Sequence, residues 1–551
     1  MKLWPAILKD SKMNMKLPRA RKRITLGGAA ALLISSQLIA QILGFLRTKL
    51  VNANFAAVGP HSTDSYFAAF TVPDFFFYTI SAGALGVAFM PVLADRLSRN
   101  DRKGMWELVS SLLNLLSIIM LVVAVVIFVF AQPILHHIVA PKLGTSQLHD
   151  AVVIMRFISL DPLIFTISGI LTATQQSLGR FFFYATAPLF YNGSIIVAAL
   201  LFSTAGNNAG GPGHLGLTGL GVGAFVGAVL QLLVVLCGTY GTGMRWRPKI
   251  LWSHVDFRQV LRNLPPRSLD QGIDQVESIV ETNVATRLGP GAVSYYSNAY
   301  TLMTAPVLLI GTAISTAVFP RLNNRLAHGR TDLFRQDFLR YLRLIIWITL
   351  PAVVICFFGR GYLARLIFSR NSGDIALVFG FLTVAILFNT LYTIMSRWFY
   401  AQKDTRTPLY ISIFTISFNI ILAFWLGSGQ EYGLQGLALA QSIAAAAEVF
   451  IMGVVMVTRD HKLFDAYFWS GVFRTVSVTG FSLLAGYVTV GFVPLGANDR
   501  GIVTLGGKLC LLAGVTLATH LIISGLYGLE EARPFWSWVR RILYRPVKVE
   551  Y

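Results

Sequence analysis

Apolar runs long enough to cross a lipid bilayer recur along the whole chain, and no other feature restricts its fold as strongly. A helix of about 20 apolar residues spans the hydrocarbon core. The 551 residues are 55% hydrophobic and only 13% charged, whereas a soluble domain carries roughly twice that charged fraction. Backbone polar groups in a bilayer must be paired within their own segment, which favours helices. The sequence therefore predicts an all-α polytopic membrane protein. The expected spans number about fourteen: 25–55, 64–94, 106–134, 149–177, 187–204, 216–240, 265–288, 292–320, 336–359, 373–401, 408–427, 433–457, 470–494 and 506–528.

The basic residues are distributed unevenly between the two sides of these spans. With the N-terminus placed in the cytoplasm, 32 of the 46 Lys and Arg residues fall in cytoplasmic segments and 6 fall on the outer side. This is the bias that membrane insertion produces, and it accounts for the net charge of +21 without a nucleic-acid partner. We expect a multi-pass protein of the cytoplasmic membrane with both termini in the cytoplasm.

Two adjacent stretches of the sequence recur at a nearly constant offset. "GPHSTDSYFAAFTVP" (59–73) matches "GPGAVSYYSNAYTLM" (289–303), and "AFMPVLADRL" (88–97) matches "AVFPRLNNRL" (317–326). The offset corresponds to six spans, an even number, so both copies enter the membrane in the same direction. This predicts parallel repeats related by an axis along the membrane normal, with a substrate site between two six-helix lobes and two helices appended.

The predicted organisation follows from the repeats and the charge runs. It consists of a basic cytoplasmic N-terminal tail (1–24), an N-lobe of spans 1–6 (25–242), a basic inter-lobe linker (243–264), a C-lobe of spans 7–12 (265–457), spans 13 and 14 (458–530) and a basic C-terminal tail (531–551).

Span 7 is unusually rich in charge for a membrane helix. Its sequence "PRSLDQGIDQVESIVET" begins at Pro266, and Pro266 together with the preceding Pro265 suits a helix start. At 100° per residue, one arginine and four carboxylates fall within an arc of about 80°. These residues are Arg267, Asp270, Asp274, Glu277 and Glu281.

Two interpretations of this stripe stay open. A carboxylate at the bilayer centre costs about 2.5–3.5 kcal/mol, so the stripe is expected to face a hydrated cavity that handles cations, protons or a charged substrate. Alternatively, Arg267 pairs with Asp270 across one turn and the other carboxylates line water passively. Carboxylates three or four residues apart share protons, which makes coupling to a sodium or proton gradient or to the membrane potential plausible. No metal site, cofactor motif or enzyme signature is found.

Spans 1 and 2 carry further charges that could belong to a binding site. Arg47 and Lys49 lie in "GFLRTKL" and could instead extend toward the membrane surface. Asp64 could simply cap its own helix. Pro73 interrupts span 2, and because broken membrane helices line cavities or are buried in protein, Asp74 beside it is a candidate site residue.

Two other spans hold isolated polar residues. In span 4, Arg156 and Asp161 are expected to form a structural pair. In span 11, Asn419 could bridge helices by hydrogen bonding.

Several stretches resemble the MurJ/MviN family, the lipid II flippases of the MOP exporter superfamily. They are "ILGFLRTKL" (42–50), "TDSYFAAFTVPDF" (63–75), "GALGVAFMPVL" (83–93), "AVFPRLNNRL" (317–326) and "FYAQKDTRTP" (399–408). The resemblance implies fourteen helices, export of a lipid-linked peptidoglycan precursor to the outer leaflet for cell wall synthesis, and a cationic cavity for the diphosphate. It also implies a lipid-tail groove formed by the last two helices with span 7. Arg47 and Asp64 stand at positions of functional family residues, which raises both as candidates.

The chain departs from the family at four positions. Gln41, Phe77 and Thr301 stand where many members have cavity arginines, and Ala82 replaces a glutamate. Diphosphate binding would then depend on Arg47, Lys49, Arg267 or other residues.

The resemblance also implies which partners to expect, and it leaves alternative activities open. The partners it implies are the lipid-linked precursor and membrane lipids, with cell wall synthesis proteins as further candidates, and we expect a monomer. The alternatives are an exporter of another lipid-linked oligosaccharide or of a cationic small molecule, or a transport-inactive scaffold for wall synthesis.

Overall fold

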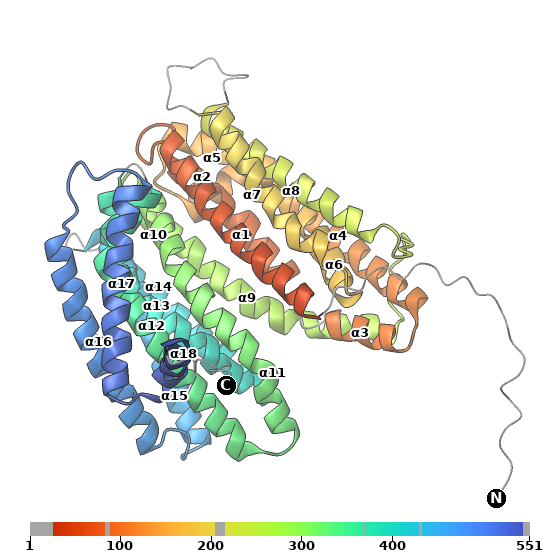
Figure 1. Ribbon diagram of the computed structural model, residues 1–551. Helices are drawn as coiled ribbons and strands as arrows, with labels where there is room; N and C mark the ends of the chain where they lie inside the picture. Colours follow the sequence, from red (N-terminus) through yellow and green to blue (C-terminus); the bar gives the residue numbers. More distant parts are fainter. Residues whose placement is uncertain (1–25, 83–88, 204–214, 369–370, 429–431, 544–551) are drawn as a thin grey trace, which may run out of the picture.

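The computed structural model describes residues 26–82, 89–203, 215–368, 371–428 and 432–543, and within these ranges every regular element is a helix. Figure 1 shows two groups of helices side by side, with a further pair at the outer edge of the second group. Among the described residues, eleven helical segments are long and apolar enough to cross a membrane. Three more complete the predicted fourteen: the first helix, the interrupted second span and the charged span 7. The predicted fold class is confirmed.

The N-lobe comprises the helices α1 to α8, which lie together in Figure 1. Its elements are α1 (Leu26–Asn54), α2 (Thr63–Phe76), η1 (Phe77–Ala82), α3 (Met90–Ser98), α4 (Arg102–Pro133), η3 (Ile134–Val139), α5 (Thr145–Ile158), α6 (Asp161–Ser177), α7 (Phe182–Leu201), η4 (Gly216–Thr218) and α8 (Gly219–Thr239).

The C-lobe repeats this order, and two membrane helices follow it. The C-lobe elements are α9 (Val255–Leu288), α10 (Ala292–Pro306), η5 (Val307–Thr312), α11 (Ala313–Ala327), α12 (Thr331–Ile367), α13 (Ser372–Ala401), α14 (Arg406–Ser428) and α15 (Gly433–Arg459). The remaining elements are α16 (Ala466–Phe492), α17 (Ile502–Leu526), η6 (Glu530–Ala532) and α18 (Arg533–Leu543).

The two copies of the repeat share an unusual break. In each lobe the second span contains a proline, Pro73 or Pro306, and continues into a π-helical segment, η1 or η5. Proline removes one backbone donor and displaces the carbonyl one turn earlier, and π segments inside helices often mark functional sites. The predicted interruption of span 2 is thus observed, a few residues beyond Pro73, and its repeat partner has the same break.

The helix α9 differs from the prediction at its start and joins the two lobes. It begins at Val255 rather than near Pro265, because His254 accepts a hydrogen bond from the Asp256 N–H and caps the helix there. The expected linker 243–264 is therefore helical over its second half. Phe257 belongs to an apolar cluster of the N-lobe, whereas Val284 lies in the main apolar cluster of the C-lobe. Positive φ angles at Gly289 and Gly291 end the helix as predicted.

Close contacts with neighbouring helices also hold α9 in place along its length. A Cβ on Gly272 would lie 2.9 Å from Thr79 of η1, and a Cβ on Gly427 of α14 would lie 2.9 Å from Val284. Glycine at both places lets backbones approach closely, as in other membrane helix pairs. One helix is thereby held against both lobes.

The two C-terminal membrane helices pack mainly against α12. Trp347 donates a hydrogen bond to Ser524 of α17 (2.9 Å), and Tyr362 donates to the Val493 carbonyl after α16 (2.6 Å). The lipid-tail groove that the family resemblance implies with span 7 stays an expectation. The predicted C-terminal tail contains a further helix, α18, beyond residue 532.

Candidate functional site: an acidic C-lobe cavity and a closed contact between the lobes

A polar cavity lies inside the C-lobe, between α9, α10, α13, α14 and α15. Its volume is about 580 Å³. Asp274, Glu277 and Glu281 of α9 line it together with Glu448 of α15, and the lining contains neither lysine nor arginine among the described residues. The three described carboxylates of the stripe on α9 thus face the interior of their own lobe. The side chains of Arg267 and Asp270 lie outside the described part of the structure.

Hydrogen bonds connect the acidic residues of this cavity to neutral side chains on the surrounding helices. Tyr296 Oη donates to Glu281 Oε1 (2.6 Å), and the Asn419 amide donates to Glu277. The Gln441 amide reaches Glu277 Oε1 at 3.0 Å and Glu281 Oε1 at 3.3 Å. The structure therefore brings four predicted site residues together: Asp274, Glu277, Glu281 and Asn419.

Glu448 and Gln441 are site residues that the sequence did not assign. Glu448 accepts a hydrogen bond from Ser412 of α14 (2.8 Å) and lines the same cavity. Glu448 is the one acidic residue of the mostly apolar helix α15, and an intramembrane ionisable residue is by default a functional candidate. That signal was present at Glu448, but the sequence could not show which helix it faces.

A second group of charged residues lies in the N-lobe. Arg47 of α1 is half-buried and is the cation that interacts with Asp74 of α2. Asp74 in turn interacts electrostatically with Asp161, the first residue of α6. Lys49, two residues after Arg47 in α1, is half-buried as well. The predicted site residues thus fall into two sets, one in each lobe.

The expected pair of Arg156 and Asp161 is wrong. Arg156 donates to the Phe128 carbonyl at 3.3 Å instead. Asp161 is 4% exposed, and neither carboxylate oxygen accepts a hydrogen bond from a described residue. The reason is a break between α5 and α6 at Ser159 and Leu160, which removes the continuous helical spacing that a sequence-based pairing assumes.

Asp64 joins the two lobes and does not cap its own helix, so that simpler interpretation of Asp64 is wrong. The carboxylate is 2% exposed. It accepts hydrogen bonds from the backbone N–H groups of Gly291 (2.7 Å) and Ser294 (2.8 Å) and from the Ser294 hydroxyl (2.7 Å). These groups form the N-terminal turn of α10, where a carboxylate is favoured by unpaired N–H groups and the helix dipole.

A second pair of side chains closes the same end of the lobe boundary. Asn298 Nδ2 donates to Asn52 Oδ1 (2.8 Å), and Asn52 Nδ2 donates back to Asn298 Oδ1 (3.2 Å). Both residues are buried. Since Asp64 and Ser294 occupy equivalent positions in the repeat, this contact lies where the two copies meet. We call Asn52, Asp64, Ser294 and Asn298 the inter-lobe contact.

The positions that depart from the family pattern hold neutral side chains. Phe77 packs edge-on against Phe165 with ring centroids 5.5 Å apart. Thr301 lines the acidic cavity, and its hydroxyl donates to the Ser297 carbonyl. Gln41 is half-buried on α1, and the side chain of Ala82 is outside the described residues.

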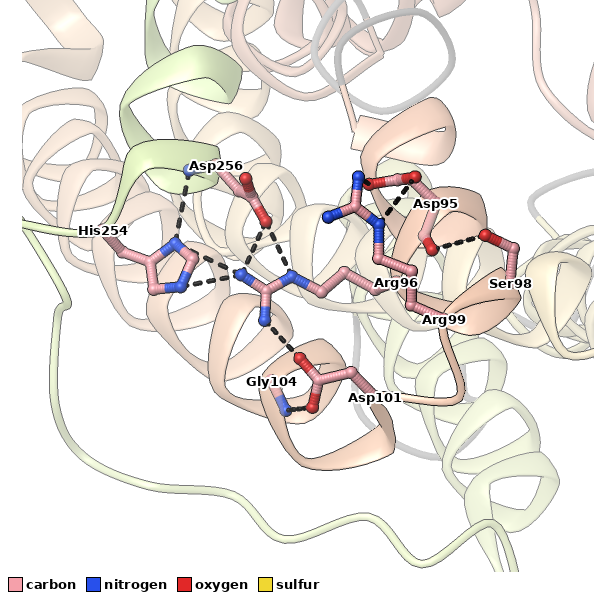
Figure 2. Close-up of polar contacts among 8 residues, drawn as sticks. All are labelled: Asp95, Arg96, Ser98, Arg99, Asp101, Gly104, His254 and Asp256. Carbon is pink, nitrogen blue, oxygen red and sulfur yellow. Dashed lines mark hydrogen bonds and ion pairs between the residues drawn. The ribbon is translucent and has the colours of Figure 1, made fainter.

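At the opposite end of the molecule, Arg96 connects α3 to the starts of α4 and α9 (Figure 2). Its guanidinium donates to Asp256 (2.6 Å) and Asp101 (2.5 Å) and lies 2.7 Å from His254 Nε2. Asp101 caps α4, and the hydrogen bond from the Gly104 N–H, with help from Arg96, lowers the pKa of Asp101. The start of α9 is thereby tied to the N-lobe.

Two repeated six-helix lobes in a membrane, each with buried charges and joined by a contact at one end, define a two-lobed transporter of the MOP type. The family model "Lipid II flippase MurJ" matches residues 57–497, so the chain belongs to that family.

Individual relatives agree with this assignment. The chain is 24% identical to a probable lipid II flippase MurJ of Rhizobium tropici, over 92% of this chain and 94% of the relative. It is 26% identical to the lipid II flippase MurJ of Burkholderia cenocepacia, over 68% and 73%. Among solved structures, a lipid II flippase MurJ in an inward closed conformation is similar with a TM-score of 0.74, at 20% identity over 90% of this chain and 98% of that one. An inward-facing multidrug MATE transporter of the MOP superfamily is similar with a TM-score of 0.66, at 16% identity over 79% and 98%. The family resemblance found in the sequence is confirmed.

Proposed function

We propose that this protein moves lipid II, the lipid-linked peptidoglycan precursor, from the inner to the outer leaflet by alternating access between its lobes. The family match over most of the chain supports this cargo. The inter-lobe contact carries the mechanism, because Asp64 holds a helix terminus of the other lobe through three hydrogen bonds and can release it as one unit. The transport cycle that we propose has no covalent step, so the free energy that drives it comes from an ion gradient or from the membrane potential.

The proposed orientation places both termini, and therefore the Arg96 network, in the cytoplasm. The excess of basic residues on that side supports it. The inter-lobe contact is then at the outer end of the lobe boundary, and the described state is closed toward the outside. Lipid II would enter from the cytoplasmic side.

Arg47 is the cation that we propose for the diphosphate of the cargo, with Lys49 and Arg267 as further cations. Guanidinium groups bind phosphate in a bidentate manner, and Arg47 is half-buried beside Asp74. Asp74 and Asp64 would then act on the cargo indirectly, by orienting Arg47 and by controlling access. Other wall-synthesis proteins are possible partners, and we propose that the chain works as a monomer.

Replacement of Arg47 tests the proposal directly. Arg47→Ala should fail to sustain growth in a strain depleted of its own flippase and should reduce lipid II exposure on the outer leaflet by at least about tenfold, because a charged hydrogen bond to phosphate is worth more than 1.4 kcal/mol. Arg500→Ala, an exposed arginine between α16 and α17, is the matched control and should retain full activity. Membrane levels of both variants are measured by immunoblot.

Two results would contradict the proposal in different ways. Wild-type lipid II exposure in Arg47→Ala would remove Arg47 from the cargo site. Failure of the unmodified chain to expose lipid II, despite normal membrane levels, would favour the scaffold or another cargo.

The acidic cavity supports a second role, the binding of the coupling cation. We propose that Asp274, Glu277, Glu281 and Asn419 bind sodium ions or protons, because Asp274, Glu277 and Glu281 line one cavity together with Glu448 and Asn419 donates a hydrogen bond to Glu277. Glu277→Gln keeps the shape and removes one charge. It should make transport insensitive to whichever gradient drives the wild type.

The measurement for this second role is lipid II exposure under imposed sodium and proton gradients. Glu107→Gln is the control, since Glu107 pairs with Arg247 at the surface. Unchanged gradient dependence in Glu277→Gln would show that the cavity is not the coupling site.

A further inference from the structure

The chain segment after α17 is fixed to the membrane helices by a turn with buried apolar residues. Gly528 has a positive φ of 64°, and Leu529 N–H donates to the Ser524 carbonyl. Leu529 and Ala532 are buried, with exposures of 3% and 0%. The backbone therefore leaves the end of α17 in one defined direction, and α18 follows directly after η6.

A buried ion pair fixes the same turn to α12. Arg343 Nε lies 2.7 Å from Glu531 Oε1, and the two side chains are 8% and 6% exposed. The Arg343 guanidinium also lies over the Tyr467 ring, 5.0 Å from its centroid, and against Gly471. Removing one member of such a pair leaves an unpaired buried charge, so the position of η6 is strongly specified.

Trp536 attaches α18 itself to α17. A Cβ on Gly525 would lie 2.5 Å from Trp536 Nε1, so the indole packs against the helix where there is no side chain. The same Nε1–H donates to the Leu521 carbonyl at 3.3 Å. The helix α18 is thereby held beside the last turn of a membrane span.

The sequence of α18, "RPFWSWVRRIL", separates apolar from basic residues around the helix. At 100° per residue, its aromatic and aliphatic positions fall on one side, and its three arginines and one serine fall on the other. Between residues 533 and 551 the chain holds five basic residues and one acidic residue. Helices of this kind lie in the plane of a membrane surface and bind anionic lipids.

Two cavities meet at Arg533, one apolar and one polar. The first, of about 570 Å³, lies between α17 and α18 and is lined by Ile522, Leu526, Leu529 and Trp536. The second, of about 840 Å³, lies between α12, the start of α16 and η6, and five arginines, Arg340 among them, and four acidic residues line it. Arg340 is exposed and makes no ion pair with a described residue.

We propose that α18 and these two cavities bind an anionic phospholipid of the adjacent leaflet, with an acyl chain in the apolar cavity and the phosphate beside Arg533 and Arg340. A phospholipid has an apolar chain next to an anionic group, which matches the order of the two cavities. The excess of basic residues favours an anionic headgroup over a zwitterionic one. This site is separate from the acidic C-lobe cavity and from the inter-lobe contact.

Tryptophan quenching by brominated lipids tests this proposal on the full-length protein. The protein is reconstituted into phosphatidylcholine vesicles that contain an equal fraction of dibrominated phosphatidylglycerol or dibrominated phosphatidylcholine. The Trp536 signal is the difference between wild type and Trp536→Phe. We expect stronger quenching of that signal by the phosphatidylglycerol, and we expect Arg533→Gln to lower this preference about fivefold.

Arg340→Gln should lower the preference as well, and Arg500→Gln at the opposite end of the molecule should leave it unchanged. Each variant is compared at equal thermal stability, so that unfolding does not imitate lost binding. Equal quenching by both lipids, no quenching of the Trp536 signal, or an unchanged preference in Arg533→Gln would each overturn the proposal. Displacement by a polyprenyl lipid but not by phosphatidylglycerol would assign the apolar cavity to the cargo and would overturn it too.

Discussion

At the scale of single residues, the Asp404 carboxylate explains the structural role of the motif "FYAQKDTRTP". Asp404 accepts hydrogen bonds from the Arg406 and Thr407 N–H groups and from the Thr407 hydroxyl, and so caps α14. Arg459, at the end of α15, donates to Asp404 (2.6 Å) and to the Thr407 hydroxyl (2.6 Å). The motif therefore fixes the loop between α13 and α14 to the end of α15.

This arrangement predicts a pH-dependent stability. Burial raises the pKa of Asp404, but the hydrogen bonds from Thr407 and Arg459 outweigh it and lower the pKa from 3.8 to about 2. A carboxylate with a lowered folded-state pKa stabilises the fold above its unfolded pKa, and the contribution is lost as the pH falls toward the folded value. Asp404→Asn should lower the Tm of the detergent-solubilised protein at neutral pH, and the difference from wild type should shrink between about pH 4 and pH 2.

The control for this prediction is Asp332→Asn. Asp332 pairs with Arg330 at the surface, with side-chain exposures of 67% and 58%, and exposed pairs contribute little. Its Tm should stay close to wild type at all pH values. If the Asp404→Asn difference persisted undiminished at pH 2, the effect would come from lost packing and not from the charge.

Single residues also show where sequence reasoning stops. The spacing of Asp274, Glu277 and Glu281 on one helix face was sufficient to group them, because helical periodicity is local. Asp64 was identified only by family resemblance, and its local neighbours suggested a cap for α2. Its true partners lie 227 and 230 residues away. A contact of that kind depends on how two lobes meet, which no local pattern contains.

At the scale of helices, three glycines spaced four residues apart hold α8 against α7. A Cβ on Gly223 would lie 2.3 Å from the Ala198 Cβ, and one on Gly227 would lie 3.0 Å from the Tyr191 carbonyl. Gly219 likewise meets the Phe202 ring. Small residues at this spacing allow close contact between membrane helices, where apolar side chains gain nothing by leaving lipid.

Gly223→Leu should therefore separate α7 from α8 and destabilise the N-lobe. Overpacking of this kind costs typically 1–3 kcal/mol, which should reduce the folded fraction recovered from membranes and lower the Tm. Gly193→Ala, on α7 with open space around its Cβ position, is the matched control and should be neutral or slightly stabilising. Equal recovery of both variants, measured by fluorescence size-exclusion chromatography, would show that the contact is dispensable.

The predicted helix boundaries agree with the structure where glycine or proline gives one clear signal for a helix end. They disagree where two different residues could each start the helix. The end of α9 at Leu288 follows from two glycines with positive φ. The start of α9 was predicted wrongly, because the proline pair at 265 and 266 is the stronger sequence signal for a helix start. The His254 cap at the observed start depends on Arg96 from another helix. The break between α5 and α6 was missed for a similar reason, since Asp161 and Pro162 read equally well as the interior of one span.

At the scale of the whole molecule, the parallel repeat was the most informative feature of the sequence. An even number of spans between two matching stretches determines the relative direction of both copies, and the observed order of elements agrees with it. The relative position of the lobes could not be derived in this way. It depends on Gly272, on the inter-lobe contact and on the Arg96 network, each of which joins segments that are far apart in sequence.

Alternating access requires the inter-lobe contact to open during each cycle. Fixing it covalently should therefore stop transport without unfolding either lobe. We expect a short bifunctional thiol reagent to link Asn52→Cys with Asn298→Cys, in a background without Cys237, Cys356 and Cys510, and to abolish lipid II exposure. A reagent with a cleavable disulfide arm should restore activity on reduction.

The control pair for this experiment lies within one lobe. Asn114 accepts a hydrogen bond from Trp246 Nε1 (3.0 Å) at the other end of the N-lobe, so linking cysteines at these positions should leave transport intact. A separate measurement tests the proposed orientation. The cysteine of an Arg500→Cys variant should react with a membrane-impermeant thiol reagent that is added outside the cell. Transport that continued with the Asn52–Asn298 link in place would mean that the lobes do not separate at this end, because a conformational change that leaves a covalently joined contact unmoved cannot open a path there.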